Sequence, residues 1–431
     1  MYSTLSAPVI IQWEVTPLCN LDCLHCYNHW RREEPVRQKT EDTNQIYKAT
    51  VSEMIVNRIF SVVVTGGEPL LVLDQVAPFL CQLRDAGVQI LLNSNLTFLN
   101  DETVIKLREL GINSILTSLS SGIPQTNNEI AQRNEAHART TRGIKIALAS
   151  GMKVTVNMVV TKVNLGDIYT TAQYVAGLGV KSFAVTKAAT PGNCLDFSQY
   201  SLSRDDFRSM LRELVRVKDE LGLCIDSLEF YPYCAFENEK TRTVFGNRIC
   251  SAGKTNCAIG YDGQVRPCSR SEASCGDIRE GFVKAWLKMS DWRSNVWLPM
   301  QCSSCSLKNK CVGGCKVDAL RTTGSISNPD PMCDFSQLPI KLTKTKIRPI
   351  RAKRFTVNPN LKHRPEKFGG ILFVTTGHWV PVEKSLYGLI CSKGKEVMNI
   401  EEIASVLDVA DRSVSETVAY LVSKSILQEK E

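Results

Sequence analysis

Three cysteines stand close together near the start of the chain. They are Cys19, Cys23 and Cys26 in the stretch CNLDCLHC, with three residues in the first gap and two in the second. Thiolates are the usual ligands of iron–sulfur clusters, and a cubic [4Fe–4S] cluster has four irons, so three thiols leave one iron open to a small molecule. A zinc site is the alternative, with His25 or His29 as the fourth ligand.

A second motif follows an apolar, β-branched run. It is VTGGEP, from Val64 to Pro69. Two consecutive glycines let the backbone come close to a ligand, and exposed carbonyl groups there can accept hydrogen bonds from an ammonium group. The motif alone would be an ordinary turn, and its combination with the cysteine triplet makes it specific.

The elements that must position these motifs extend from residue 8 to about residue 235. Amphipathic segments such as 43–58, 74–86, 101–110 and 138–150 alternate with six short β-branched runs, at 9–15, 61–65, 88–94, 114–119, 153–160 and 181–186. This alternation predicts an α/β fold, a partial (β/α)6 TIM-like barrel over residues 1–235. Chemistry in such folds gathers at the carboxyl ends of the strands, where both motifs fall.

Together the two motifs resemble those of the radical S-adenosylmethionine (SAM) enzymes, whose hallmark is CxxxCxxC followed by Gly-Gly-Glu. The resemblance implies that Cys19, Cys23 and Cys26 form the catalytic centre by ligating a reducible cluster, with SAM chelated to its open iron. One electron would then cleave SAM homolytically, and the 5′-deoxyadenosyl radical would remove hydrogen from an unactivated carbon.

The same resemblance implies a set of SAM contacts. Gly66, Gly67 and Glu68 would hold the methionine amino group, and His25 and Tyr27 would lie near the adenine. The remaining candidates are Ser94, Asn95, Ser118, Arg133 and Asn157. Ser120 stands where the family has an acidic residue.

A cysteine-rich segment spans residues 236–340. Its order of seven cysteines resembles the SPASM extension of radical SAM enzymes, which binds two auxiliary [4Fe–4S] clusters. The implied ligands of the first cluster are Cys250, Cys268 and Cys315, and those of the second are Cys302, Cys305, Cys311 and Cys333. We expect Cys257 to complete the first set. The alternatives for this fourth ligand are Cys234, Cys275 and an open iron. For residues 302–315 the alternative is a zinc ribbon.

The C-terminal part is expected to be a basic linker, residues 341–365, followed by a domain at 366–431. Residues 341–367 hold ten Lys or Arg against one acidic residue. A hairpin and three helices predict a winged-helix-like domain, with capping boxes starting at Asn399 and Ser413. It resembles the PqqD-like recognition element of peptide-modifying systems, which captures a leader peptide by strand addition.

The basic linker would suit an acidic leader. A nucleic-acid partner is not expected, because DNA binding needs a basic face, and residues 411–424 carry only Arg412 and Lys424 against Asp411 and Glu416.

Composition narrows the class of protein further. The chain has 431 residues and 17 cysteines, an odd and high number that favours metal binding over disulfides. We expect a cytoplasmic protein without membrane contact, because the N-terminus lacks a secretion signal and no segment reaches the roughly 20 apolar residues of a membrane helix.

The sequence therefore predicts a radical SAM/SPASM maturase that installs a cross-link in a ribosomally synthesised precursor peptide. The product could be a thioether, an ether or a carbon–carbon bond. The expected cofactors are SAM and three [4Fe–4S] clusters, and the expected electron donor is a flavodoxin or ferredoxin. The alternatives are a sulfatase maturase, a tetrapyrrole-modifying enzyme, or an iron–sulfur regulator that binds DNA.

Overall fold

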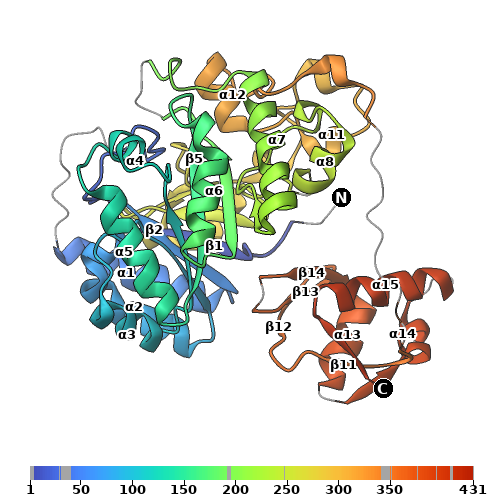
Figure 1. Ribbon diagram of the computed structural model, residues 1–431. Helices are drawn as coiled ribbons and strands as arrows, with labels where there is room; N and C mark the ends of the chain where they lie inside the picture. Colours follow the sequence, from blue (N-terminus) through green and yellow to red (C-terminus); the bar gives the residue numbers. More distant parts are fainter. Residues whose placement is uncertain are drawn as a thin grey trace. The chain divides into compact units, whose positions relative to one another are not determined.

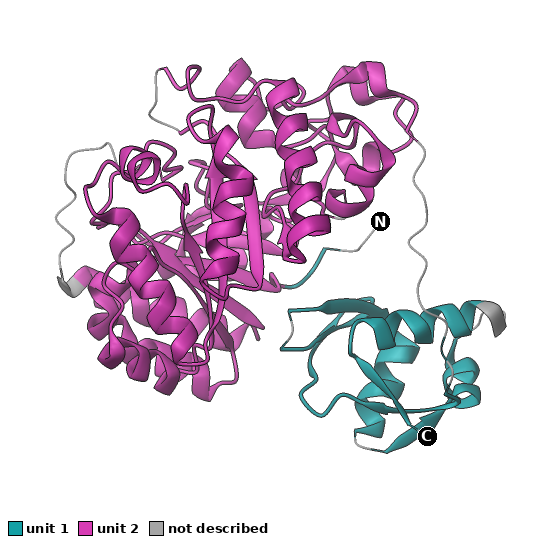
Figure 2. Cartoon of the chain, in the orientation of Figure 1, with its two compact units in different colours: residues 1–6, 343–431 teal, residues 7–342 magenta. Residues whose placement is uncertain are grey.

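The computed structural model describes residues 4–28, 30, 40–191, 196–246, 248–340, 350, 352–375, 377–394, 396–407 and 411–430. The chain divides into two compact units, a larger one of residues 7–342 and a smaller one of residues 1–6 and 343–431 (Figure 2). No helix in these ranges is both long and apolar enough to cross a membrane.

The larger unit is built on a ten-stranded sheet with the order β10-β9-β8-β1-β2-β3-β4-β5-β6-β7. The strands from β1 to β7 are parallel and follow one another in chain order. All six strands predicted from the sequence are among them, and β7 is an additional strand that was not predicted. The seven are β1 (Ile10–Thr16), β2 (Ser61–Gly66), β3 (Gln89–Asn93), β4 (Ser114–Ser118), β5 (Lys153–Val160), β6 (Ser182–Lys187) and β7 (Cys224–Asp226).

Helices connect these strands and contact their neighbours, α1 with α2, α3 with α5 and α6 with α7 (Figure 1). They are α1 (Thr40–Val56), α2 (Leu73–Asp85), α3 (Asp101–Glu109), α4 (Pro124–Ala131), α5 (Ala136–Ala149), α6 (Ile168–Gly177) and α7 (Arg204–Leu221). This confirms the α/β class with a parallel central sheet. The sheet places the loops that follow β1 to β6 along one edge, as parallel strands must.

The cysteine-rich segment is part of the same unit. Strand β8 (Asn256–Ile259) pairs in parallel with β1, and β9 (Gln264–Arg266) and β10 (Gly276–Asp277) extend the sheet antiparallel. The boundary predicted at residues 235–236 therefore falls inside one compact unit. Its helices are α8 (Glu239–Phe245), α9 (Phe282–Leu287), α10 (Ser290–Arg293), α11 (Lys308–Cys311) and α12 (Lys316–Thr323).

The smaller unit contains two three-stranded sheets, β12-β13-β14 and β15-β11-β16, and three helices. The predicted hairpin and helices are present, and Asn399 and Glu402 form the expected capping box of α14. Helix α15 begins before Ser413, so the second capping box is wrong. The elements are β11 (Arg354–Val357), β12 (Lys362–Glu366), β13 (Gly369–Phe373), β14 (Trp379–Glu383), α13 (Lys384–Lys393), β15 (Val397–Asn399), α14 (Ile400–Val406), α15 (Asp411–Ser423) and β16 (Leu427–Lys430).

Strands β11 and β12 also correct the predicted linker. Residues 341–349 and 351 lie outside the described residues, but both strands fall within the range expected to be a tether. Phe355 and Val357 of β11 are buried in the core of the smaller unit. The basic residues between and around them hid this alternation in the sequence, and Arg364 of β12 is itself buried against Glu366.

Candidate active site

The cysteine triplet lies on the loop that directly follows β1. Cys19, Cys23 and Cys26 are all half-buried there. On one side, two backbone hydrogen bonds join the loop to the end of α4. Asp22 N donates to Ala131 O at 3.1 Å, and the second bond, from the amide two residues later in the loop, is 2.9 Å long. The loop is therefore fixed through its backbone.

The Gly-Gly-Glu motif holds the other side of this loop. Gly67 N donates to Thr16 O and Glu68 N donates to Leu18 O, both at 2.7 Å. A Cβ atom on Gly67 would lie 1.9 Å from Leu18 O, and one on Gly66, whose φ is +125°, would lie 2.5 Å from Thr16 O. The glycines thus let the two backbones touch, so the two sequence motifs form one structural unit.

Glu68 connects this unit to the end of β3. Its buried carboxylate accepts hydrogen bonds from Ser94 Oγ at 2.7 Å, from Asn95 N at 2.8 Å and from Leu70 N at 3.0 Å. Burial raises the pKa of Glu68, and these three hydrogen bonds oppose the shift. The side chain expected to bind the amino group of SAM is therefore itself held rigidly and fixes Ser94 and Asn95.

Asn95 and Arg133 both reach the cysteine loop. Asn95 Nδ2 lies 3.9 Å from Cys19 Sγ and donates to Asn20 Oδ1 at 2.9 Å. The exposed Arg133 donates from Nε to Asn20 O at 3.2 Å. Cys19, Asn95 and Arg133 were all predicted from the sequence. The structure brings them together at the cysteine loop, although they come from three separate segments.

His25 and Tyr27 flank the last cysteine and differ in their environment. Burial lowers the pKa of His25 to about 4, so the ring is neutral at pH 7, and its buried Nδ1 has no hydrogen-bond partner in the described part of the chain. Burial raises the pKa of Tyr27 to about 12, and the side chains of Ser269 and Thr65 oppose the shift. A buried ring nitrogen without a partner is what a ligand-contacting histidine would show before its ligand binds.

Ser118 and Asn157 lie opposite each other on β4 and β5. Asn157 Oδ1 accepts a hydrogen bond from Thr186 Oγ1 of β6 at 2.9 Å, so this side chain joins two strands. Ser120 N donates to Asn127 Oδ1 at 2.9 Å. These residues stabilise the rim of the sheet, and the bonds named here do not reach the cysteine loop.

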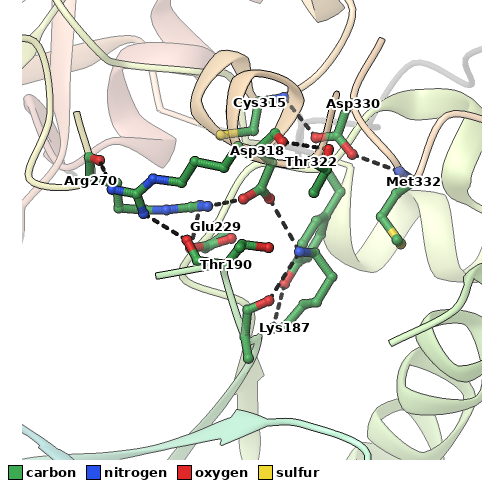
Figure 3. A network of polar contacts seen from close by, with 12 residues as sticks. Lys187, Thr190, Glu229, Arg270, Cys315, Asp318, Thr322, Asp330 and Met332 are labelled. Atoms are coloured by element: carbon green, nitrogen blue, oxygen red, sulfur yellow. Dashed lines mark hydrogen bonds and ion pairs between the residues drawn. The ribbon is translucent and has the colours of Figure 1, made fainter. Parts of the chain in front are cut away.

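A buried network of charges at the end of β6 was missed from the sequence (Figure 3). Lys187, the last residue of β6, donates from Nζ to Asp318 Oδ2 of α12 at 3.2 Å. Asp318 also pairs with Arg270, which binds Glu229 at 2.8 Å. A lysine directly after the apolar run SFAVT was the available signal. The network ties the barrel to the cysteine-rich segment.

The charges in this network outweigh the effect of burial on Asp318. Burial opposes ionisation of this carboxyl group, but Arg270 and Lys187 lower its pKa to about 2. Asp330 lies in the same network and accepts hydrogen bonds from Cys315 N and Met332 N, both at 2.8 Å. These bonds fix the backbone at Cys315 and just before Cys333, two of the candidate cluster ligands.

The second predicted group of cysteines does converge. Its four members line one cavity, together with a fifth cysteine, Cys234. Burial raises the pKa of Cys302 to about 11 and that of Cys311 to about 12. Thiolates therefore need a cation to compensate for burial, as the iron of a cluster would do. The four are Cys302, Cys305, Cys311 and Cys333.

The first predicted group is arranged more loosely. Cys268 is half-buried, and the charge of Cys250 adds to the rise of its pKa that desolvation causes. The charges of Cys268 and Cys315 both act on the buried Arg270. The three thiols implied by the resemblance thus share one region, next to the Lys187–Asp318 network.

Cys257 remains the predicted fourth ligand of the first group, and the structure separates it from Cys234, one of its alternatives. Cys257 is fully buried in β8. Burial raises its pKa, and the charge of Cys275 adds to this rise. Cys234 lines the cavity of the second group instead of joining the first. Spacing along the chain could not separate them, because the fold decides which thiol faces which cavity.

Lys316 places a positive charge between the two groups. Its buried Nζ donates to Trp297 O at 2.6 Å. Burial lowers its pKa, and the charges of Cys302 and Cys250, one from each group, oppose that shift. Within the described ranges, no three His, Cys, Asp or Glu side chains converge as a single metal ion requires. A [4Fe–4S] cluster does not require this, because each thiolate binds a different iron.

The comparisons with known proteins agree with this geometry. Residues 13–175 match the family model of the radical SAM superfamily. The chain carries a radical SAM domain. That family implies SAM and a [4Fe–4S] cluster as cofactors.

Several relatives resemble most of the chain. The AdoMet-dependent heme synthase of Oleidesulfovibrio alaskensis is 23% identical, over 76% of this chain and 87% of the relative. The PqqA peptide cyclase of Gluconobacter oxydans is 24% identical, over 77% and 92%. The structure of Streptococcus suis SuiB bound to its precursor peptide SuiA superposes with a TM-score of 0.61 at 19% identity, over 76% of each chain.

We expect Gly67→Ala to disrupt the cysteine loop, because the new methyl group would overlap Leu18 O. The free energy of unfolding should fall by about 3 kcal/mol in a urea titration, and the iron bound per chain should fall as well. Gly166→Ala is the control, since no described atom lies within 4 Å of its Cβ position. Equal stability and iron content in both variants would contradict the proposed contact.

Asp318→Asn should leave Lys187 and Arg270 without their shared partner and lower the free energy of unfolding by about 3–5 kcal/mol. Because folding lowers the pKa of Asp318 to about 2, its contribution is complete above about pH 4 and is lost as the pH falls towards 2. The gap between wild type and variant should shrink over that range. Asp85→Asn, in an exposed pair, should change stability by less than about 1 kcal/mol. A similarly small effect of Asp318→Asn would refute the role of the network.

Proposed function

We propose that the chain is a peptide maturase with two auxiliary [4Fe–4S] clusters of the SPASM type and a recognition unit for the leader of a precursor peptide. The observation that carries this proposal is the second compact unit, a hairpin sheet with three helices, on the same chain as the three groups of cysteines. The modification would be a cross-link such as a thioether, an ether or a carbon–carbon bond. The reaction would take place in the cytoplasm, with a flavodoxin or ferredoxin as electron donor.

The residues present fit the cofactors. Cys19, Cys23 and Cys26 would hold the SAM-binding cluster, which supplies, when bound, the electron that cleaves SAM. The neutral His25 is buried and has a ring nitrogen to offer to the ligand. Glu68 and Asn95 would orient the methionine end, because their hydrogen bonds leave them little freedom. The auxiliary sites would be the two further cysteine groups.

The hairpin of the smaller unit has two edges, and their chemistry differs. Val374 N donates to His378 O at 3.0 Å, and paired residues alternate between hydrogen-bonded and non-bonded along the ladder. Pro381, paired with Ile371, is therefore in a non-bonded pair and directs its backbone nitrogen outward. By the same count Pro365 of β12 faces outward too.

Strand β14 is the better candidate for peptide capture. Its apolar residues Trp379 and Pro381 are partly exposed, whereas β12 exposes His363 and part of Lys362. Charged residues and proline on an edge strand discourage pairing with another chain. A leader added to β14 would use the outward groups of Trp379 and the carbonyl of Pro381, and the basic residues preceding the sheet would favour an acidic leader.

A tetrapyrrole-modifying enzyme is the second candidate. The similarity to heme synthases, at 23% identity over 76% of the chain, favours it. The smaller unit argues for the peptide, because a small planar substrate does not need an additional sheet edge. A sulfatase maturase would also act on a polypeptide, and substrate tests would separate it from a maturase of small peptides.

Replacing Cys19, Cys23 and Cys26 by Ala should abolish 5′-deoxyadenosine production under strong reductant, since SAM would have no open iron to bind. Anaerobically reconstituted protein, SAM and dithionite are sufficient for the assay. Cys81→Ala is the control, as this half-buried thiol in α2 belongs to none of the three groups. Continued cleavage of SAM by the triple variant would contradict the assignment.

Pro381→Ala should restore an outward N–H group on β14 and strengthen binding of the precursor's leader about fivefold, the equivalent of one added hydrogen bond. Pro365→Ala adds the same group to β12 and should leave affinity unchanged. Fluorescence anisotropy of a labelled leader peptide from a neighbouring precursor gene would measure both. A response to Pro365→Ala alone, or to neither substitution, would exclude strand addition at β14.

A further inference from the structure

Cys234 is a buried cysteine that the seven-cysteine pattern does not include. It lies in the 3-10 turn Tyr233–Ala235, well before the first cysteine of that pattern. Its side chain nevertheless lines the same cavity as Cys302, Cys305, Cys311 and Cys333. The cavity thus presents five thiols.

The contacts of Cys234 are those of a member of the site. It is packed in one buried cluster with Cys311 and Cys333. The residues that line the cavity also include Cys302 and Cys305. Cys234 therefore lies beside two of the four implied ligands and shares a cavity with all four.

The neighbouring residue takes part in the same site. Tyr233 is buried in the same cluster as Cys311 and Cys333 and also lines the cavity. The short turn that carries Cys234 is therefore packed directly against two of the implied ligands, which keeps its thiol beside them.

We propose that Cys234 is a ligand-competent thiol of the second auxiliary site, where it and Cys333 are alternative ligands of one iron. This inference rests on the proposed function, because a cluster of four irons must bind there for a fifth thiol to be in reserve. The packing of Cys234 and Cys333 in one buried cluster fits this arrangement, because the thiol that does not coordinate stays beside the one that does.

The test uses the full chain with Cys19, Cys23 and Cys26 replaced by Ala, so that only auxiliary clusters contribute. In this parent we compare Cys333→Ala, Cys305→Ala and the double variant Cys333→Ala with Cys234→Ala. After anaerobic reconstitution, iron and sulfide per chain are measured. Electron paramagnetic resonance of the reduced protein with and without cyanide then reports an iron that lacks a thiolate.

We expect Cys333→Ala to keep the parent's iron content and its response to cyanide. The double variant should gain a cyanide-sensitive signal or lose about half of the auxiliary iron, the share of one cluster of two. Cys305→Ala is the matched control, because Cys305 lines the cavity but is not in the buried cluster that contains Cys234 and Cys333. It should already show the defect of the double variant.

Two outcomes would overturn the inference in different ways. If Cys333→Ala behaves like Cys305→Ala while the parent is fully loaded, Cys234 is not a reserve ligand and the proposed function stands. If the parent binds no auxiliary iron, both proposals fail. Cys333→Ser and circular dichroism separate a ligand effect from misfolding, since the hydroxyl fills the same space and should restore the fold without restoring a thiolate.

Discussion

The close contact between two backbone segments underlies the rest of the site. Gly66 and Gly67 approach Thr16 and Leu18 so closely that no side chain fits between them. Parallel pairing of β1 with β2 brings these segments together, and the absence of two Cβ atoms allows the contact. This contact fixes the position of the loop with three thiols relative to the sheet. A redox centre with an exchangeable ligand requires such a fixed position.

A second constraint acts at the end of β6. Lys187 extends from the last predicted strand to Asp318, and Arg270 joins the same carboxylate. Buried charges are costly unless each is paired, so the network favours one arrangement of barrel and cysteine-rich segment. Because Arg270 neighbours Cys268 and Cys315, that arrangement also places the first auxiliary group of thiols.

The sequence predicted the parallel strands well because they are apolar and separated by amphipathic helices. It also predicted that the cysteine triplet and the Gly-Gly-Glu motif lie at the same edge of the sheet, since they follow consecutive strands. It failed where pairing is non-local: β8 is only four residues long, yet it joins β1, and basic residues concealed β11 and β12. The partners of Cys257 and Cys234 depend on which cavity each thiol faces, and spacing contains no such information.

Electron–nuclear double resonance of the reduced full-length protein would show whether SAM binds the open iron of the N-terminal cluster. SAM labelled with magnetic isotopes in its amino and carboxylate groups would be added before freezing. We expect hyperfine coupling of both labelled groups to a [4Fe–4S] cluster, and this coupling should disappear when the three N-terminal cysteines are replaced. A reduced cluster that shows no coupling to either group would contradict an iron held open for SAM.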